Sequence, residues 1–363
     1  MSHPFTMNLR IEDGFDEFSS RFPMKYLRAL LTRNDASCMQ QMKGQRMRVS
    51  KLKSILSVIA TLTLSAIHMP AVAQDLCTPS EVTDPQALHI NGSKPFVYKS
   101  IGGADLRLHV FSPPGHKVAD KTPAAVFFYG GGFVFGDVRR YQTQATHLAL
   151  LGMVTVLVDY RVRCRNKSTI MDSVADGKSA MRWVRGHATQ LGIDPSRIAV
   201  VGSSAGGQMA AATALIPVFN DPKDPDIDAH PNALILYNPA LDMVAIADRL
   251  EPLVGKESAS RARELSPWEY LAKGKLPPTI IFQGAADTAT TPDKALQFCK
   301  RAKSLKFQCD VVIYPGAPHG FTEPWLGLDD PKLGIKYEEW AWDAIRRSDG
   351  FFRKLGWLPA ARR

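Results

Sequence analysis

The sequence predicts an α/β protein with a mostly parallel central sheet, helices on both faces of that sheet, and a short lid or excursion. Two observations support this fold class. From about residue 100 onward, short β-rich runs alternate with longer helical segments, as they do in chains built of strand–helix units. Several β-rich runs are continuously apolar, which is typical of parallel strands buried on both faces.

The individual elements follow from this pattern in chain order. The expected strands are Leu106–Phe111, Ala124–Tyr129, Val154–Asp159, Ile198–Val201, Ala233–Tyr237, Thr279–Phe282 and Asp310–Tyr314. The expected helices are Gln142–Leu151, Asp172–Leu191, Ala205–Leu215, Pro292–Leu305 and a final one over roughly Tyr337–Leu355, which ends near Gly356.

One stretch interrupts the alternation of strands and helices. Residues from about 239 to 277 separate two expected strands and contain Pro252, Gly255 and Pro267. A connection this long is uncommon within a compact domain and is more typical of a lid or an excursion. We therefore expect one domain over residues 74–363 that carries this excursion.

The segment before residue 74 is interpreted as an export signal. A basic start at Met47, an apolar run over Ile55–Ile67 and an Ala-Val-Ala sequence at 71–73 together make up a secretory signal peptide, residues 47–73. The alternatives are a buried core helix and a membrane anchor. The apolar run is shorter than the roughly 20 residues that a membrane span needs, which argues against stable membrane insertion. We expect cleavage after Ala73 and a periplasmic or secreted protein.

Residues 1–46 precede this complete signal, although an export signal normally opens a chain. We interpret them as an upstream segment from a mis-assigned start, with translation beginning at Met47. The sequence has 45 Lys and Arg against 35 Asp and Glu, of which ten and five precede residue 74, so the exported part carries a net charge of +5. It has no dense basic run, so nucleic-acid binding is not expected. The oligomeric state stays open.

Four cysteines remain in the exported part, and an oxidising compartment permits them to form disulfides. They are Cys77, Cys164, Cys299 and Cys309. Cys299 lies late in an expected helix and Cys309 at the start of the next strand, so the two can come within bridging distance. A disulfide and two free buried thiols are both compatible with this pair. The sequence holds no CxxC motif or His and Cys cluster, so no metal site is predicted.

The main chemical signal is the sequence Gly-Ser-Ser-Ala-Gly at 202–206. It follows the expected strand Ile198–Val201 and leads into the helix that begins at Ala205. A Gly-x-Ser-x-Gly sequence between a strand and a helix is typical of the nucleophile elbow, a turn too tight for neighbouring β-carbons. Ser204 is therefore the expected nucleophile. Taken alone, the pentapeptide would also fit an ordinary Gly- and Ser-rich turn.

A nucleophilic serine needs a base within hydrogen-bond reach, and folds with this elbow order their triad as serine, acid and histidine. His319 lies in a loop after the last expected strand and is the expected base, with a surface histidine as the alternative. Asp287 follows the strand Thr279–Phe282 and would hold the imidazole in the required tautomer. The competing Asp293 is better interpreted as a first-turn helix residue.

Donors for a tetrahedral oxyanion are expected in the sequence Tyr-Gly-Gly-Gly-Phe at 129–133, which follows a buried strand. Glycines let backbone N–H groups approach a substrate oxygen without intervening side chains. The N–H groups of Gly131, Gly132 and Ala205 are the expected oxyanion hole, and a flexible Gly-rich turn is the alternative. The reaction predicted from these residues is acyl transfer through Ser204, and it requires no metal or organic cofactor.

From about residue 100 to 357 the chain resembles the α/β-hydrolase superfamily. Within it, the chain is similar to hormone-sensitive-lipase-like esterases and to secreted carbohydrate acetyl- and feruloyl-esterase-like enzymes. The resemblance is carried by Tyr129–Gly132, Asp159–Arg161, Gly202–Gly207, Asp287 and His319–Phe321. It implies an α/β-hydrolase fold and a serine carboxylester hydrolase. The family usually opens its glycine motif with His, where this chain has Tyr129. Because that His mainly anchors the loop, the oxyanion hole should survive the change.

The resemblance and the export signal favour acetyl or other short acyl groups on a polysaccharide or a small-molecule ester. A broad-specificity short-chain carboxylesterase or a feruloyl-type esterase is the alternative. A serine exopeptidase would usually carry a further large domain, and a non-catalytic binder would show a damaged triad. Phe133 and Trp325 are the aromatic residues expected to line a substrate pocket. Asp176 and the Asp159–Arg161 segment are interpreted as structural.

Overall fold

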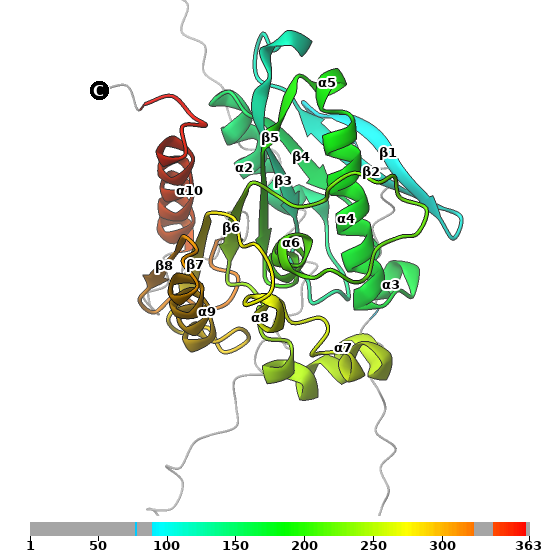
Figure 1. Ribbon diagram of the computed structural model, residues 1–363, viewed down its shortest axis with the longest axis vertical. Coiled ribbons are helices and arrows are strands. Elements are labelled where there is room, and N and C mark those ends of the chain that lie inside the picture. Colours follow the sequence, from blue (N-terminus) through cyan, green and yellow to red (C-terminus); the bar gives the residue numbers. More distant parts are fainter. Residues whose placement is uncertain (1–76, 78–88, 323–336, 361–363) are drawn as a thin grey trace, which may run out of the picture. The chain divides into compact units, whose positions relative to one another are not determined.

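The computed structural model describes residues 77, 89–322 and 337–360, which all belong to one compact unit. Their strands form an eight-stranded sheet in the order β1-β2-β4-β3-β5-β6-β7-β8 (Figure 1). The pairs β1–β2 and β2–β4 are antiparallel, and the other neighbouring strands are parallel. This confirms the predicted fold class. The strands are β1 Lys94–Ile101, β2 Ala104–Phe111, β3 Thr122–Phe128, β4 Val154–Val158, β5 Ile193–Ser203, β6 Ala233–Tyr237, β7 Thr279–Gly284 and β8 Cys309–Tyr314.

The middle of the sheet is the core of the protein. Every residue of β4, β6 and β7 is buried, as expected for apolar strands covered on both sides. The edge strand β1 was not expected from the sequence. Its residues are exposed or half-buried, and it contains none of the continuous apolar character by which the other strands were recognised.

Two neighbouring residues of β3 show that helices cover both faces of the sheet. The Phe127 ring packs against Tyr141, which precedes helix α2 (Gln142–Leu150), with ring centroids 5.2 Å apart. The next ring, Phe128, lies against Gly177 of helix α4 (Ile170–Gly186). Because successive side chains of a strand point to opposite faces, α2 and α4 lie on opposite faces of the sheet.

Two further helices, α10 (Tyr337–Lys354) and α6 (Ala205–Leu215), pack beside these two. Asp349 of α10 pairs with His147 of α2 at 2.9 Å, and Met209 of α6 lies against Gly177 of α4. Among the described residues, no helix is long and apolar enough to cross a membrane. The helices are α2 Gln142–Leu150, α3 Arg163–Asn166, α4 Ile170–Gly186, α5 Ala188–Leu191, α6 Ala205–Leu215, α7 Ala247–Ser260, α8 Pro267–Tyr270, α9 Pro292–Ser304 and α10 Tyr337–Lys354.

The single helix expected over Asp172–Leu191 is in fact two helices. α4 ends at Gly186 and α5 begins at Ala188, because His187 between them has a non-helical backbone (φ −100°, ψ 12°). The final helix α10 follows its predicted range to within one residue at its end. The stretch between β6 and β7 forms the short 3-10 helix Val244–Ile246 followed by α7 and α8, so the predicted excursion is helical.

Two disulfides join parts of the described chain. Cys299 of α9 is bonded to Cys309 of β8, with Cα atoms 5.2 Å apart, so the bridge and not the pair of free thiols is present. Cys77 is bonded to Cys164 of α3, and this pair was not expected because 87 residues separate the two in sequence. The second bridge ties Cys77 to the segment that follows β4.

Candidate active site

The turn between β5 and α6 holds Ser204 in a strained conformation. Ser204 has φ 52° and ψ −118°, and its N–H donates to the carbonyl of Tyr237 at 3.0 Å. A β-carbon at Gly202 would lie 2.2 Å from the carbonyl oxygen of Gly206, and one at Gly206 would lie 2.1 Å from that of Phe128. Only glycine fits at either position, which explains the Gly-x-Ser-x-Gly spacing.

The structure brings the three expected triad residues into one hydrogen-bonded chain. His319 Nε2 lies 2.8 Å from Ser204 Oγ, and His319 Nδ1 lies 2.8 Å from Asp287 Oδ2. They come from three separate loops, after β5, β7 and β8, at the carboxyl edge of the parallel strands. An ionised Asp287 can only accept, so Nδ1 carries the proton and Nε2 is free to accept from the serine.

Asp287 is held by more partners than the sequence indicated. The N–H groups of Ala289 and Thr290 each donate to Oδ1 at 2.9 Å, and Gln283 Nε2 donates to Oδ2 at 3.0 Å. The Thr290 hydroxyl lies 2.9 Å from Oδ2 and 3.2 Å from His319 Nδ1. Gln283 was missed, although a polar residue near the end of an otherwise apolar strand is a signal that could have found it.

These contacts set the charge of Asp287. Burial alone would raise the pKa of this carboxyl group. The hydrogen bond and charge of His319, together with the hydrogen bonds from Thr290, outweigh burial and hold the pKa of Asp287 below its ordinary value. The carboxylate therefore stays ionised and able to orient the imidazole. Asp293 lies in the first turn of α9, as expected.

The glycine loop after β3 lies directly beside the nucleophile. A β-carbon at Gly130 would lie 3.3 Å from the Ser204 Cβ, and one at Gly131 would lie 2.0 Å from the carbonyl oxygen of Phe135. Gly131 and Gly132 have φ of 135° and 63°. This backbone shape is accessible mainly to glycine, so the residue type at these positions follows from the geometry of the loop.

The expected oxyanion donors therefore come from two elements at one edge of the sheet. Gly131 and Gly132 belong to the loop beside Ser204, and Ala205 is the first residue of α6. The N–H of a first helical residue has no acceptor inside its own helix. It is available to a substrate oxygen, and the positive end of the helix dipole favours negative charge there.

Tyr129 anchors this loop at the position where the resembling family usually has His. Its ring stacks on Tyr160 with centroids 4.1 Å apart. Its hydroxyl lies 3.0 Å from the Tyr160 carbonyl oxygen and 3.2 Å from Asp159 Oδ1. Asp159 also accepts from Arg165 Nη2 at 2.6 Å. Burial raises the pKa of Asp159 to about 6, against the opposing charge of Arg165.

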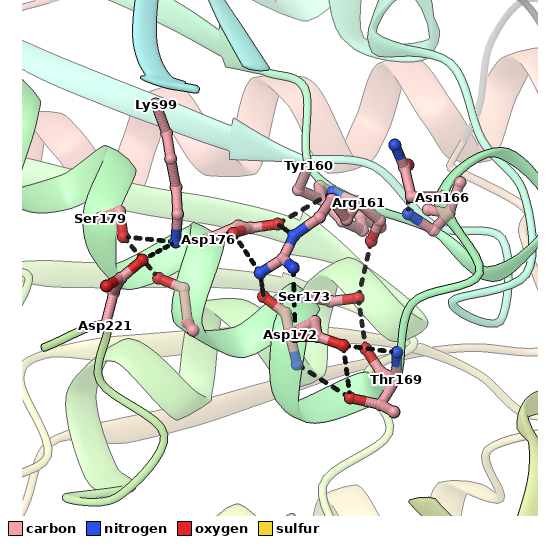
Figure 2. A network of polar contacts seen from close by, with 12 residues as sticks. Lys99, Tyr160, Arg161, Asn166, Thr169, Asp172, Ser173, Asp176, Ser179 and Asp221 are labelled. Carbon is pink, nitrogen blue, oxygen red and sulfur yellow. Dashed lines mark hydrogen bonds and ion pairs between the residues drawn. The ribbon is translucent and has the colours of Figure 1, made fainter. Parts of the chain in front are cut away.

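Arg161 and Asp176 form the centre of a structural ion-pair network (Figure 2). Arg161 Nε lies 2.7 Å from Asp176 Oδ2, and Arg161 Nη1 lies 3.2 Å from Asp172 Oδ1. Lys99 of β1 reaches the other Asp176 oxygen at 3.0 Å. Asp176 is fully buried and ties β1, α4 and the segment after β4 together. It is a structural contact, as the sequence predicted.

Of the two aromatic residues expected to line a substrate pocket, the structure describes one. The Phe133 side chain is 3% exposed and packs in the hydrophobic core, so its role as a pocket residue stays a prediction. Trp325 lies outside the described residues. Across the described ranges, no group of three or more His, Cys, Asp or Glu side chains is arranged to hold a metal ion.

The sheet topology, the elbow and the Ser–His–Asp geometry define a protein of the α/β-hydrolase class. A family model for the alpha/beta hydrolase fold matches residues 125–323, and the chain belongs to this family. Esterase 2 of Thermogutta terrifontis in its apo form is 34% identical, with a TM-score of 0.68, over 76% of this chain and 98% of that one. A structure of the same esterase bound to propionate is 34% identical with a TM-score of 0.66, over 75% and 97%.

Curated relatives carry esterase names. Esterase LipC of Mycobacterium tuberculosis is 29% identical over 55% of this chain and 53% of its own length. Carboxylesterase NlhH of the same organism is 37% identical over 31% of this chain and 34% of its own. The chain spans about half the length of the first of these curated relatives.

Proposed function

We propose that this protein is a serine carboxylester hydrolase that forms an acyl-enzyme on Ser204. The observation that carries this proposal is the continuous chain of 2.8 Å contacts from Ser204 through His319 to Asp287. The family and the esterase names of its relatives add support.

In the proposed reaction His319 Nε2 takes the Ser204 proton as Oγ attacks the ester carbonyl carbon. The N–H groups of Gly131, Gly132 and Ala205 stabilise the oxyanion, and removal of one such donor typically costs about 3 kcal/mol in the barrier. His319 then protonates the departing alcohol. A water molecule, deprotonated by the same nitrogen, hydrolyses the acyl-enzyme and releases the acid.

For the substrate we propose a short acyl group, with acetyl esters of carbohydrates as the first candidate. The export signal expected from the sequence and the resemblance to secreted carbohydrate esterases support this choice. A broad short-chain carboxylesterase is the second candidate, favoured by the T. terrifontis enzyme that is described with propionate and with butyrate bound. Two disulfides, which oxidising compartments favour, support the further proposal that the protein is exported after cleavage behind Ala73.

A panel of substrates tests the function and separates its two forms. Purified protein and its Ser204→Ala variant would be assayed on p-nitrophenyl acetate, butyrate and octanoate, on acetylated xylan, and on an aminoacyl p-nitroanilide. Turnover of esters by the parent and not by the variant is expected. Acetate release from xylan supports the carbohydrate esterase, and activity confined to p-nitrophenyl esters supports the broad one. Equal activity of the variant, or turnover of the anilide alone, would contradict the proposal.

A further inference from the structure

A cavity of about 540 Å³ lies beside the Cys77–Cys164 disulfide. One wall is formed by α3 and the residues that lead from it to α4, and the opposite wall by the kinked middle of α7. Neither the triad nor the three glycines beside Ser204 are among the residues that line this cavity.

The walls of the cavity are positively charged. Arg163, Lys167 and Lys256 line it, and Glu257 is the acidic residue among the lining side chains. Lys167 and Lys256 are exposed, and none of the three cations forms an ion pair with another described residue. Arg163 Nη1 donates to the Leu253 carbonyl at 2.9 Å, which fixes the guanidinium and leaves its other N–H groups for a ligand.

The start of α4 also contributes positive potential to the cavity wall. Thr169, which caps this 17-residue helix, also lines the cavity, so the positive end of the helix dipole lies at its wall. Asp172, which accepts from the Thr169 backbone and hydroxyl in the capping box and pairs with Arg161, is not among the residues that line the cavity (Figure 2). Of the charged side chains that do line it, three are cationic and one is acidic.

One wall of the cavity is hydrogen-bonded to the residues that follow the proposed oxyanion loop. The N–H of Arg163 donates to the Phe133 carbonyl at 2.9 Å, and the N–H of Cys164 donates to the Val134 carbonyl at 2.9 Å. Phe133 and Val134 directly follow the glycines. The segments that carry α3 and α7 leave the sheet at the carboxyl ends of β4 and β6, the edge that also carries Ser204. Ligands of open α/β sheets bind at this edge.

We propose that this cavity is a subsite that binds a carboxylate on the acyl or alcohol portion of the ester whose carbonyl reacts at Ser204. This inference rests on the proposed function and adds a substrate class, half-esters of dicarboxylic acids or sugar acids that are acylated on a hydroxyl group and keep a free carboxylate. Arg163 supplies a forked donor that suits the two oxygens of a carboxylate. Lys167 and Lys256 contribute charge from flexible stems, and their attraction weakens as salt screens it.

The test compares matched charged and neutral substrates. Rates of ethyl half-esters of succinate, adipate, suberate and sebacate would be measured by pH-stat, beside ethyl alkanoates of the same chain lengths. At one or more lengths the half-ester is expected to have the lower KM, and this preference is expected to shrink from 20 mM to 500 mM salt. A preference for the neutral ester at every length would overturn the inference.

Substitution of the lysines locates the effect. The double variant Lys167→Gln with Lys256→Gln is expected to lose roughly fivefold in kcat/KM on the preferred half-ester, since exposed charge pairs contribute modestly. Its rate on the neutral ester is expected to stay unchanged. Lys300→Gln, an exposed lysine of α9 away from the cavity lining, is the matched control.

Equal losses on both substrates in the double variant, or an equal loss in the control, would contradict the subsite. If neither class of ester is hydrolysed while p-nitrophenyl acetate is, the inference alone fails. If p-nitrophenyl acetate is not hydrolysed either, the proposed function itself fails. Hydrolysis of neutral esters without any preference for half-esters would remove the inference alone.

Discussion

The hydroxyl of Tyr160 donates a 2.6 Å hydrogen bond to the carbonyl oxygen of Tyr129, and the two rings stack 4.1 Å apart. Tyr129 immediately precedes the three glycines beside Ser204, so this bond holds the start of the proposed oxyanion loop. Both side chains are fully buried, so neither hydroxyl could turn to water if its partner were lost.

Replacement of Tyr160 by Phe should therefore reduce activity as well as stability. The Tyr129 carbonyl loses its partner, which costs about 1–3 kcal/mol in the free energy of unfolding. Because the loop is less firmly placed, kcat on p-nitrophenyl acetate is expected to fall about tenfold, less than the loss from removal of a whole oxyanion donor.

Tyr98→Phe is the matched control for that prediction. Tyr98 of β1 donates its hydroxyl to the Asp159 carbonyl oxygen at 2.7 Å, and not to a carbonyl of the glycine loop. This variant should lower the thermal midpoint and leave kcat unchanged. A fall in kcat as large as that of Tyr160→Phe would show that the loop is not specifically anchored by Tyr160.

The two glycines of the proposed oxyanion hole should respond differently to alanine. A β-carbon at Gly131 meets the Phe135 carbonyl oxygen at 2.0 Å, so Gly131→Ala must displace the loop. At Gly132 the nearest atom to the added carbon is 3.9 Å away, on Val134, and only the positive φ of 63° opposes it. We expect Gly131→Ala to lower kcat by at least about 100-fold. Gly132→Ala should lower the free energy of unfolding by roughly 1 kcal/mol, with a smaller loss in kcat.

Comparable kcat values for Gly131→Ala and Gly132→Ala, measured on p-nitrophenyl acetate, would contradict the prediction that only the first substitution displaces the loop. Circular dichroism of both variants would establish that each is folded.

Asp287→Asn should remove most of the activity and leave the fold in place. The amide can donate to His319 Nδ1, which selects the tautomer whose Nε2 carries the proton and cannot accept from Ser204. In other Ser-His-Asp enzymes this change lowers kcat by about 10⁴. Single-turnover measurement of acylation would place the loss in that step. A loss below about tenfold would show that Asp287 is not the acid of the triad.

The lowered pKa of Asp287 also predicts a pH dependence of stability. Its folded pKa lies below the unfolded value of about 3.9, so the carboxylate contributes stability that is fully present above that value and is lost as the pH falls through the folded pKa. In the folded protein the Asp287 carboxyl, followed by carbon-13 NMR, should titrate below its ordinary value of about 3.9. A carboxyl that titrates above that value would contradict the lowered pKa.

The two disulfides should contribute unequally to stability. In the chain-entropy account, a bridge stabilises by restricting the unfolded chain, and the effect grows with loop length. The Cys77–Cys164 bridge closes a separation of 87 residues and the Cys299–Cys309 bridge one of 10. Removal of the first with paired serines is expected to cost about 4 kcal/mol and removal of the second about 3 kcal/mol or less. Chemical denaturation of both double variants would measure the two losses in unfolding free energy. A larger loss for the Cys299–Cys309 bridge would contradict this prediction.

Much of the fold could be predicted because the central strands are apolar throughout and the turns carry diagnostic glycines. β3, β4 and β6 match their expected ranges closely for this reason. The edge strand β1 was missed because Lys94–Ile101 faces solvent along much of its length and pairs with only one neighbour. The Cys77–Cys164 bridge was missed because nothing local links residues so far apart in sequence.

The three triad residues could also be predicted from the sequence. Ser204, Asp287 and His319 each lie within a few residues of the end of a recognisable strand, so chain order was enough to name them. The residues that support them were not predictable in this way. Thr290 reaches Asp287 and His319 only because the loop after β7 turns back on itself, and the Tyr129–Tyr160 pair forms between the segments that follow β3 and β4.

Covalent labelling of Ser204 tests the central proposal most directly. The protein would be treated with a fluorophosphonate, and its intact mass and proteolytic peptides would be measured beside those of Ser204→Ala and His319→Ala. We expect one adduct per chain, on Ser204, absent in Ser204→Ala and formed far more slowly in His319→Ala. An unlabelled parent protein, or an adduct that persists in Ser204→Ala, would contradict the assignment of Ser204 as the nucleophile.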